Sequence, residues 1–327
     1  MDVAIFGAGR IGKIHAGNIV QQPGVRLKYV VDPDAQAAAA LASQHDASVG
    51  SIEGVFDDAS IRAVAIASST DTHADLIQRA AAAGKAIFCE KPVDLALARA
   101  RECANAVKRA GVPCMIGFQR RHDPTFAAAK ARLDDGEIGT PEQLVITSRD
   151  PGAPPLDYLK RSGGIFKDML IHDFDVFRWI LGDEAETVYA TGSVLTDANV
   201  AKAEDVDVTA VVIRTRSGRL AVINTNRRAA YGYDQRFEVL GSKGMLQAGN
   251  HRPTEVISYT ERHVAADKPE HFFLERYRVA YAVEIGHFFA ALQSGKPMAT
   301  TIDDGVAALE LAEAATTSWH EKRIVTL

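Results

Sequence analysis

The sequence predicts an α/β protein in which an N-terminal doubly wound parallel sheet precedes a domain with a large open, mainly antiparallel sheet. A chain of 327 residues is longer than one ordinary core requires and suits two domains. In the first third, short apolar runs alternate with Ala-rich helical segments, which is typical of βαβ units. After about Phe118 longer strand-like runs follow one another. We therefore expect one domain over residues 1–118 and a second over residues 119–327.

The first domain is expected to alternate strands and helices. Its predicted strands are the segments DVAIFG, RLKYVVD, AVAIASS, AIFCEKP and PCMIGF. Its predicted helices cover roughly residues 11–22, 35–45, 73–83 and 96–110. Gly84 and Gly111 follow two of these helices, at the position where a residue in the left-handed conformation commonly ends a helix.

The second domain is expected to pair its strands mainly antiparallel. The strand-like runs are EQLVITSRD, TVYATGSVL, VDVTAVVIRT, RLAVINTNRR and QRFEVLGSKGMLQAG. The turn RSGR, Arg216 to Arg219, predicts a hairpin between two of them. Two late helices, over residues 271–294 and 303–321, are expected to cover one face of the sheet. Subunit association would then bury the other face, which predicts an oligomer.

Composition excludes several classes of protein. Hydrophobic residues at 47% and charged residues at 24% are typical of soluble globular proteins, and no apolar run approaches the roughly 20 residues of a membrane span. The net charge of −5 comes from mixed acidic and basic residues without a basic stripe, so nucleic acid is not an expected partner. The three cysteines, Cys89, Cys103 and Cys114, form no disulfide or zinc pattern and indicate a reducing compartment. Because the N-terminus has no secretory signal pattern, we expect a cytoplasmic location.

A glycine-rich turn follows the first predicted strand. In GAGRIG, Gly7 permits a tight turn, Gly9 lets the backbone approach a pyrophosphate, and Gly12 allows close contact between helix and strand. The N-terminus of the following helix favours an anion. Asp32 ends the second strand, where its carboxylate can accept hydrogen bonds from the ribose hydroxyls of adenosine and would repel a 2′-phosphate. These features predict a dinucleotide site that prefers NAD to NADP.

Two further loops follow predicted strands at the sheet edge where open α/β folds bind ligands. The loop SSTDTHADL places Thr70 and His73 near the cofactor, although His73 could equally begin a helix without touching a ligand. In CEKPVDL, Pro92 stiffens the turn that presents Lys91. A lysine at a strand end is usually a surface charge. Beside a dinucleotide, however, its ammonium group can stabilise negative charge that develops on an alcohol oxygen during hydride loss.

The segment SGGIFKDMLIHDFDVFRWI, residues 162–180, is predicted to form one helix with an apolar face. Asp168, His172 and Asp175 fall at i, i+4 and i+7 and would share one stripe of that helix. The stripe has two interpretations. It is either the solvated face of an amphipathic helix or a set of acid–base groups that faces a site.

The chain resembles the glucose-fructose oxidoreductase and inositol dehydrogenase family, called Gfo/Idh/MocA, over nearly its whole length. The motifs that carry the resemblance are GAGRIG, TDTHADLI, AGKAIFCEKP, GFQRRHDPTFAAAKARLDDGEIG, ITSRDP and SGGIFKDMLIHDFDVFRWILG. The last three are most similar to those of bacterial inositol 2-dehydrogenases. Gln119 stands where the family commonly has Asn, so contacts with the substrate or the nicotinamide are expected to differ there.

The resemblance implies a Rossmann domain, a homotetramer built through the open sheet, and NAD as cofactor, with no metal required. It implies that Lys91, Asp168 and His172 are catalytic, with Asp175 on the helix surface or in support of them. The implied cofactor-binding residues are Gly7, Gly9, Arg10, Ile11, Gly12, Asp32, Ser69, Thr70, His73, Glu90, Lys91 and Gln119. The implied substrate-binding residues are Lys91, Gln119, Asp150, Tyr158, Asp168, His172 and Tyr233. Some loop residues vary among relatives that act on different sugars. For these residues, which are Asp150, Tyr158, Tyr231 and Tyr233, a structural role is the alternative to substrate binding.

The expected reaction is the NAD-dependent oxidation of a cyclitol, with myo-inositol giving the 2-keto product. His172 would take the hydroxyl proton, Lys91 would hydrogen-bond the same oxygen, and Asp168 would hold a neighbouring hydroxyl. Two alternatives stay open. One is a different substrate, either scyllo-inositol or an aldose such as glucose. The other is a cofactor-binding regulator without catalysis, against which the presence of all three residues argues.

Overall fold

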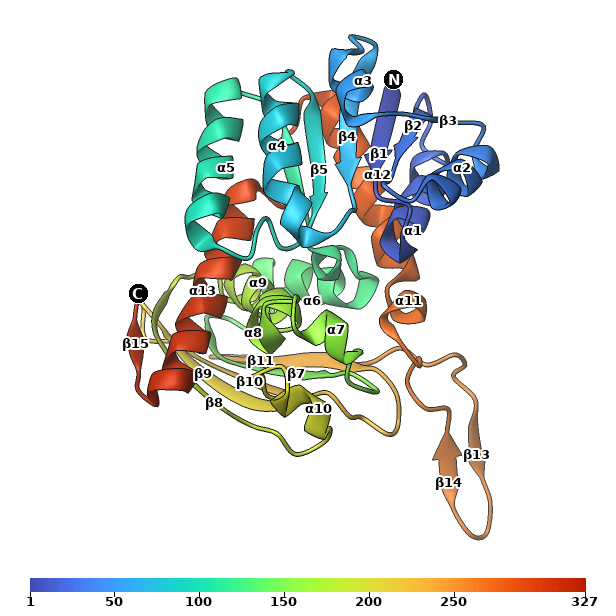
Figure 1. The fold of residues 1–327 in the computed structure, drawn as a ribbon. Helices are drawn as coiled ribbons and strands as arrows, with labels where there is room; N and C mark the ends of the chain where they lie inside the picture. The colour runs from blue at the N-terminus through green and yellow to red at the C-terminus, as the bar shows by residue number, and fades with distance from the viewer. The chain divides into compact units, whose positions relative to one another are not determined.

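The computed structural model describes residues 1–327, and contacts within the chain group them into two compact units (Figure 1). The first unit combines Met1–His122 with Ala280–Leu309. The second combines Asp123–Val279 with Glu310–Leu327. Each unit contains one large sheet, parallel in the first and mainly antiparallel in the second, so the predicted fold class is confirmed.

The sheet of the first unit is 6-stranded and parallel, in the order β3-β2-β1-β4-β5-β6. The strands are β1 (Asp2–Phe6), β2 (Arg26–Val31), β3 (Ser48–Val49), β4 (Ile61–Ile66), β5 (Ala86–Glu90) and β6 (Cys114–Gly117). Every strand predicted for this region is present, and the short exposed β3 is added to them. The chain adds strands toward one edge of the sheet from β1 to β3 and toward the other edge from β4 to β6. Sheets of this kind bind ligands at the point of this reversal, between β1 and β4, beyond the carboxyl ends of the strands.

The four helices predicted for the first domain are all present in the first unit. The unit contains α1 (Arg10–Ile19), α2 (Ala35–Gln44), α3 (Ile52–Asp57), α4 (His73–Ala82), α5 (Leu97–Ala110) and α12 (Arg278–Ser294), with the 3-10 turns η1 (Thr70–Thr72) and η2 (Gln119–His122). The Asp34 carboxylate accepts hydrogen bonds from the first N–H groups of α2. Gly111 ends α5 in the left-handed conformation, as predicted, with a φ of 65°. Helix α3 was not predicted from the sequence.

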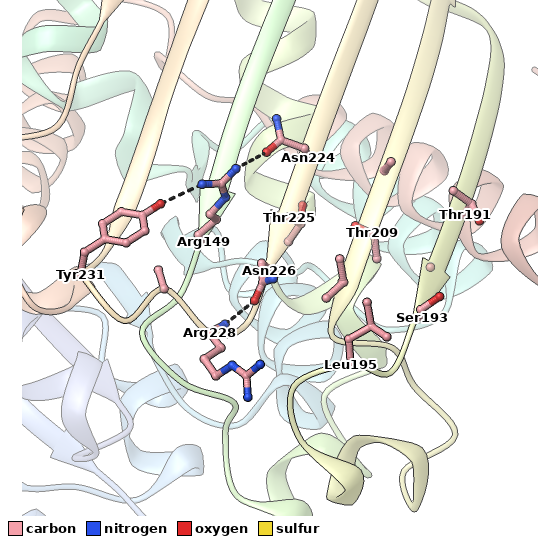
Figure 2. Close-up of a pocket in the computed structure, with 14 residues that line it drawn as sticks. Arg149, Thr191, Ser193, Leu195, Thr209, Asn224, Thr225, Asn226, Arg228 and Tyr231 are labelled. Atoms are coloured by element: carbon pink, nitrogen blue, oxygen red, sulfur yellow. Dashed lines mark hydrogen bonds between the residues drawn. The ribbon is translucent and has the colours of Figure 1, made fainter.

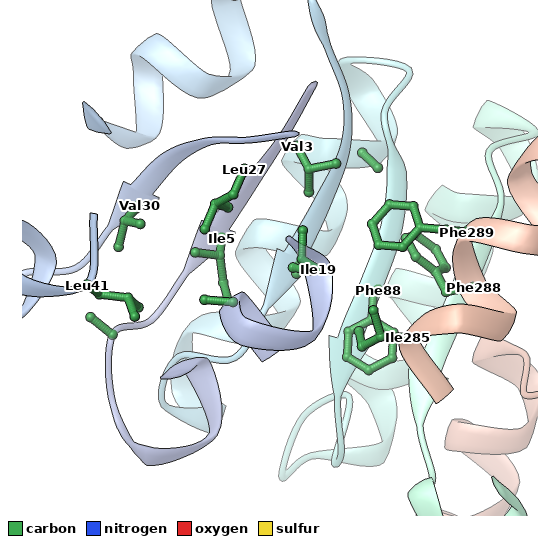
Figure 3. Packing of buried hydrophobic residues seen from close by; sticks show 14 of the residues in the cluster. Val3, Ile5, Ile19, Leu27, Val30, Leu41, Phe88, Ile285, Phe288 and Phe289 are labelled. Atoms are coloured by element: carbon green, nitrogen blue, oxygen red, sulfur yellow. The ribbon is translucent and has the colours of Figure 1, made fainter. Parts of the chain in front are cut away.

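One face of the parallel sheet is covered by α1, α2 and α12 (Figure 3). Phe88 of β5 packs against Phe288 of α12 with ring centroids 5.8 Å apart, and Phe288 packs against Phe289 at 5.1 Å. Ile285 of α12 and Ile19 of α1 are also fully buried in this cluster. Burial of each large apolar side chain contributes roughly 1.5–3 kcal/mol. Helix α12, although it lies late in the sequence, is therefore part of the core of the first unit.

The sheet of the second unit is 7-stranded, in the order β12-β11-β7-β10-β9-β8-β15. The strands are β7 (Pro141–Arg149), β8 (Ala185–Ser193), β9 (Val208–Thr215), β10 (Leu220–Asn226), β11 (Asp234–Gly241), β12 (Gly244–Ala248) and β15 (Val325–Thr326). Strands β7 and β10 pair parallel, and the other neighbours pair antiparallel. The predicted hairpin joins β9 to β10, with Gly218 in its turn at a φ of 90°. The predicted run QRFEVLGSKGMLQAG forms two strands, β11 and β12, because it turns back at its centre.

Most helices of the second unit are short. They are α6 (Pro124–Asp134), α7 (Leu156–Leu159), α8 (Gly164–Asp168), α9 (Ile171–Leu181), α10 (Ala198–Ala201) and α11 (Phe273–Arg276). The longer α13 (Ile302–Glu321) belongs to the first unit up to Leu309 and to the second from Glu310. The prediction of one helix over residues 271–294 is wrong, because Tyr277 leaves helical geometry between α11 and α12 with a φ of −109°. Tyr277 is fully buried and packs on Tyr233 at a centroid distance of 5.9 Å, which fixes the backbone at the break.

One face of the antiparallel sheet is not covered by helices (Figure 1). Along β9 and β10, buried residues alternate with residues that are less buried. Large apolar side chains of the sheet that are at least two-fifths exposed are Tyr189, Val212, Leu220, Leu240 and Met245. Apolar surface of this kind is typical of a face that binds another protein.

The remaining strands form a small separate hairpin in the second unit. Strands β13 (Ile257–Tyr259) and β14 (Val264–Ala266) pair antiparallel, and their residues are exposed. Among the helices of both units, none combines the length and the apolar character needed to cross a lipid bilayer.

Candidate active site

Backbone geometry explains the glycines of the turn between β1 and α1. Gly7 has a φ of 104°, and a Cβ there would lie 2.4 Å from the carbonyl oxygen of Ala67. A Cβ on Gly12 would lie 2.0 Å from the carbonyl oxygen of Gly7, so a larger residue would separate α1 from the turn. At Gly9, the N-cap of α1, a Cβ would meet no atom within 4 Å. The open space at Gly9 and the N–H groups at the start of α1 fit an approaching pyrophosphate.

The Asp32 carboxylate lies just after β2, beside this turn. Its Oδ2 accepts a hydrogen bond from the Ala8 N–H at 2.7 Å, and its Oδ1 accepts one from the Asp34 N–H at 2.8 Å. These backbone donors hold the carboxylate in its orientation. Each carboxylate oxygen keeps further acceptor capacity, so the group can still accept hydrogen bonds from ribose hydroxyls, and its charge disfavours a phosphate in the same place.

Lys91 and Pro92, joined by a cis peptide bond, begin the turn after β5. His73 ties this turn to the loop after β4, because its Nδ1 lies 2.8 Å from the Pro92 carbonyl oxygen and its Nε2 lies 3.1 Å from the Ser68 carbonyl oxygen. Burial lowers the pKa of the His73 imidazole, so the ring is neutral and donates to one carbonyl at a time. His73 also begins α4, which is the alternative role that the sequence left open for it. A contact of His73 with the cofactor stays a prediction.

Glu90, the last residue of β5, lies beside His15 of α1. The His15 Nε2 and a Glu90 carboxylate oxygen are 2.6 Å apart, and the fully buried imidazole packs edge-on against two aromatic rings. Buried Glu284 of α12 completes a group whose possible metal-ligand atoms lie within 4.8 Å of one another. Because the His15 Nε2 already contacts Glu90, we interpret the group as a hydrogen-bonded His15–Glu90 pair with the Glu284 carboxylate close to it. The pair connects the helix of the glycine turn to the strand that precedes Lys91, and His15 was not among the predicted site residues.

The other residues predicted to contact the cofactor follow the carboxyl ends of parallel strands. Arg10 and Ile11 begin α1 after β1, and Ser69 and Thr70 form the start of η1 after β4. Gln119 begins η2 after β6 and is buried. Carboxyl ends of parallel strands meet at one edge of a sheet, so the first unit brings the predicted cofactor residues to a common edge.

The helix predicted over residues 162–180 is wrong as a single element. Helix α8 ends at Asp168 and α9 begins at Ile171, with the chain between them turned so that Met169 and Leu170 are buried. Asp168 therefore ends one helix, and His172 lies in the first turn of the next.

The predicted stripe is broken as a consequence. Asp175 is fully buried, which contradicts a place on the helix surface and leaves its alternative, a role in support of the catalytic residues, as a prediction. Asp168 and His172 are both only partly buried. The three residues therefore do not form the solvated face of one helix. Asp168 lies on α8, whereas His172 and Asp175 lie on α9, because the buried Met169 and Leu170 separate the two helices.

Asp168 is held by two side chains of the second unit. The Tyr158 hydroxyl donates to its Oδ1 at 2.8 Å, and the Arg227 Nη2 lies 3.5 Å from its Oδ2. Burial and, next, the charge of Asp168 raise the pKa of the Tyr158 phenol, which therefore stays protonated and remains a donor. The structure thus brings together Tyr158 and Asp168, both predicted to bind substrate. Arg227 was not among the predicted site residues, because in the sequence it follows a strand as an ordinary surface arginine would.

The remaining residues predicted to bind substrate have structural partners in the second unit. Tyr233 is buried and packs edge-on against two aromatic rings. Asp150 forms backbone hydrogen bonds with Asn226, the last residue of β10, and with Ala229 just after it. The Tyr231 hydroxyl accepts a hydrogen bond from Arg149 at 2.8 Å and donates to Asp234 at 2.5 Å. A role in substrate binding stays a prediction for Asp150 and Tyr233.

A depression of about 480 Å³ lies on the uncovered face of the second sheet (Figure 2). Arg149 spans it, donating to Tyr231 on one side and to the Asn224 side-chain oxygen at 3.1 Å on the other. The ends of β8, β9 and β10 form the rest of its wall. Asp168 and His172 do not line it, so we do not place the chemistry in this depression.

Two family models match the chain. The model described as "Oxidoreductase family, NAD-binding Rossmann fold" matches residues 1–118. The model described as "GFO/IDH/MocA C-terminal domain" matches residues 126–247. Each model matches part of one of the two units that the structure distinguishes, and residues 248–327 lie outside both matches.

Individual proteins are similar over nearly the full length. The chain is 48% identical over 323 residues to an inositol 2-dehydrogenase of Rhizobium meliloti, which covers 99% of this chain and 98% of that protein. It is 44% identical over 329 residues to a myo-inositol 2-dehydrogenase of Thermotoga maritima, covering 100% and 98%. Among solved structures, the scyllo-inositol dehydrogenase of Lactobacillus casei with bound NAD(H) and scyllo-inositol superposes with a TM-score of 0.93 at 28% identity, covering 100% and 98%.

Proposed function

The chain belongs to the Gfo/Idh/MocA family of oxidoreductases, and from this premise we propose that it is an NAD-dependent dehydrogenase that oxidises myo-inositol to the 2-keto cyclitol. Similarity of nearly the whole chain to inositol 2-dehydrogenases, at 44% to 48% identity, is the observation that carries the proposal. Residues 1–118 form the NAD-binding domain in this proposal, and residues 119–327 bind the substrate and associate with other subunits.

The residues of the first unit fit NAD. The glycine turn leaves space for a pyrophosphate at Gly9, and Asp32 keeps acceptor capacity for ribose hydroxyls. The negative charge of Asp32 supports a preference for NAD over NADP in this proposal. NAD, when bound, supplies the hydride acceptor for the oxidation of the carbinol carbon.

Three side chains carry the proton and charge chemistry in this proposal. His172 accepts the proton of the substrate hydroxyl, because an imidazole can act as general base near neutral pH. Lys91 donates a hydrogen bond to the same oxygen and stabilises its developing negative charge. Asp168 accepts a hydrogen bond from a neighbouring hydroxyl, with its carboxylate orientation supported by the Tyr158 hydroxyl.

A second candidate substrate is scyllo-inositol, favoured by the likeness to the dehydrogenase crystallised with that cyclitol. The two epimers differ only in the configuration of the carbon that loses its hydride, so both give the same ketone. Product identity cannot separate them, whereas kcat/KM measured on each alcohol can. Two alternatives are weaker, namely an aldose as the substrate and a role as a cofactor-binding regulator without catalysis.

NADH absorbance with a panel of alcohols tests the proposal. We expect NADH to form with cyclitols, with the highest kcat/KM for myo-inositol and much lower values for glucose. We also expect little NADPH when NADP replaces NAD. A higher kcat/KM for scyllo-inositol would replace the substrate assignment. Absence of NADH with every alcohol, from a folded protein that binds NAD, would favour the regulator.

The uncovered apolar face supports a homotetramer as part of the proposal. Light scattering is expected to give the mass of four chains, and a monomer at micromolar concentration would contradict the assembly. A cytoplasmic location stays a prediction, which fractionation of the producing cell would test.

A further inference from the structure

Arg227 follows β10 and is the largest fully buried side chain of the protein. Burial of a guanidinium is costly unless charged and hydrogen-bonding partners compensate for the lost water. The Arg227 Nε and Nη1 have no hydrogen-bond partner within the chain. Its position is therefore set mainly by the carboxylates near Nη2.

Those carboxylates belong to Asp168 and Asp205. The Arg227 Nη2 lies 3.5 Å from the Asp168 Oδ2 and 3.9 Å from the Asp205 Oδ2. The other oxygen of Asp205 accepts a hydrogen bond from the Ile165 N–H at 3.0 Å, in the first turn of α8. Asp168 ends the same helix. The guanidinium therefore connects the residue that holds the start of α8 to the residue at its end.

The two oxygens of the Asp168 carboxylate have different partners. Oδ1 accepts from the Tyr158 hydroxyl, whereas Oδ2 faces the guanidinium. Burial raises the pKa of Asp205, and the Ile165 N–H and the Arg227 charge oppose that rise. The positive charge thus favours the ionised form of the Asp205 carboxylate.

We propose that Arg227 is a positioning residue for the dehydrogenase reaction, holding Asp168 through the bridge Asp205–Arg227–Asp168 in the orientation that binds the substrate. The inference rests on the proposed function, because Asp168 contacts substrate only there. The simpler account, that Arg227 only neutralises buried charge, predicts a loss of stability without a change in substrate affinity. The two accounts are separable by steady-state kinetics.

Arg227→Met removes the charge and keeps an unbranched side chain. We expect kcat/KM for myo-inositol to fall roughly 10- to 100-fold, the range seen when a supporting partner of a site residue is lost. Part of the fall should be a higher KM, because the loosened carboxylate binds the substrate hydroxyl less well. The Kd for NAD should stay within about twofold, since Arg227 lies in the second unit.

Arg228→Met is the matched control. Arg228 is the adjacent arginine, but it is exposed and its side chain donates to the Thr196 carbonyl oxygen. This variant should keep the KM and kcat of the wild type. Arg227→Lys should recover part of the loss and not all of it, because an ammonium keeps the charge but the shorter side chain does not place a donor where Nη2 lies, near both carboxylates.

A double substitution tests whether Arg227 acts through Asp168. In Asp168→Asn, which already lacks the carboxylate, adding Arg227→Met should lower kcat/KM by less than about threefold further, because residues acting on one group are not additive. A full additional loss would overturn the inference. So would a folded Arg227→Met that loses kcat alone with an unchanged KM.

Failure of the inference is distinguishable from failure of the proposed function. If the wild type oxidises no cyclitol, the proposed function fails and the positioning role fails with it. If the wild type is active and Arg227→Met matches it, only the inference fails. Should Arg227→Met not fold, Arg227→Lys decides, because a folded Lys variant with wild-type KM and kcat overturns the inference.

Discussion

The two sheets bury their strands differently. In the first unit, β5 is buried at every position and β4 at all but one, because helices cover both faces of the parallel sheet. In the second unit, β9 alternates buried residues with exposed or partly exposed ones, because helices cover one face only. A continuous apolar run therefore indicates a strand whose two faces are both covered by helices of the same unit. An alternating run with valine and leucine on its outer positions indicates a face that another molecule covers.

The two candidate sites differ in a parallel way. In the first unit, backbone groups shape the site, since the turn depends on glycines and the Asp32 and His73 side chains bond to backbone atoms. In the second, side chains from distant segments hold one another, as Tyr158 and Arg227 hold Asp168. We expect the first unit to control cofactor binding and to add Lys91 to the chemistry, and the second unit to supply the general base and the substrate-binding carboxylate. Four predictions test the differences between the two units.

The largest effect is expected from His172→Ala. Loss of a positioned general base should lower kcat by roughly 10² to 10⁴, while the Kd for NAD stays unchanged. His263→Ala, at an exposed histidine of the β13–β14 hairpin, serves as the control and should retain full turnover. Turnover of His172→Ala within threefold of the wild type would remove His172 from the proposed chemistry.

A pair of alanine substitutions compares the two sheets directly. Phe288→Ala should lower the free energy of unfolding by roughly 3–5 kcal/mol, because it opens a cavity between α12 and β5. Val212→Ala, on the uncovered face of β9, should change it by less than about 0.5 kcal/mol in a monomer. Denaturant titration measures both values. A Val212→Ala loss that grows with protein concentration would show that another subunit covers this face.

Asp32→Ala tests whether the first unit controls the choice of cofactor. The ratio of kcat/KM with NAD to that with NADP should fall roughly 10- to 100-fold, because the substitution removes charge-assisted hydrogen bonds to ribose and the repulsion of a phosphate. The KM for the cyclitol should change little. Wild-type activity that is equal with both cofactors would contradict the role of Asp32.

The smallest expected effect concerns His122, one of the buried imidazoles of the first unit. Burial, followed by the charges of His287 and Arg121, lowers its pKa from 6.5 to about 3. The folded protein keeps the ring neutral, whereas the unfolded chain binds a proton below about pH 6.5. The stability that the neutral His122 ring contributes is therefore fully present above that pH, and it is lost as the pH falls toward 3.

The measurement is the free energy of unfolding between about pH 6 and 4. His122→Gln should flatten its pH dependence by up to about 1.4 kcal/mol per pH unit, the slope of one proton. The double substitution with His287→Gln controls for the contact of 3.0 Å between the two rings. An unchanged slope would mean that His122 takes up its proton without unfolding.

Much of the first unit was predictable from local sequence. Gly7 and Gly12 each meet a backbone constraint that only glycine satisfies, and Gly111 ends α5 in the left-handed conformation. Such constraints act within a few residues, so a short motif contains them. The five strands expected in this region are present for the same reason, since each apolar run is long enough to cross a covered sheet.

The errors lie where distant residues decide the backbone. The segment over residues 162–180 has helical periodicity throughout, yet it divides after Asp168 so that Met169 and Leu170 are buried. The segment over residues 271–294 divides at Tyr277, whose ring packs on Tyr233. Periodicity reports which residues are apolar, but it does not report against which partner they pack.

By itself, the sequence determined the fold class, the glycine turn with Asp32, and the presence of Lys91, Asp168 and His172 in motifs resembling those of a dehydrogenase family. Tertiary structure alone decided that Asp175 is buried and that His15 contacts Glu90 across 75 residues of chain. It also placed Arg227 beside Asp168, 59 residues away. The physical reason is the range of the forces involved. Backbone constraints and hydrophobic periodicity act between near neighbours in sequence, whereas a buried charge finds its partner only after the sheet has brought distant segments together.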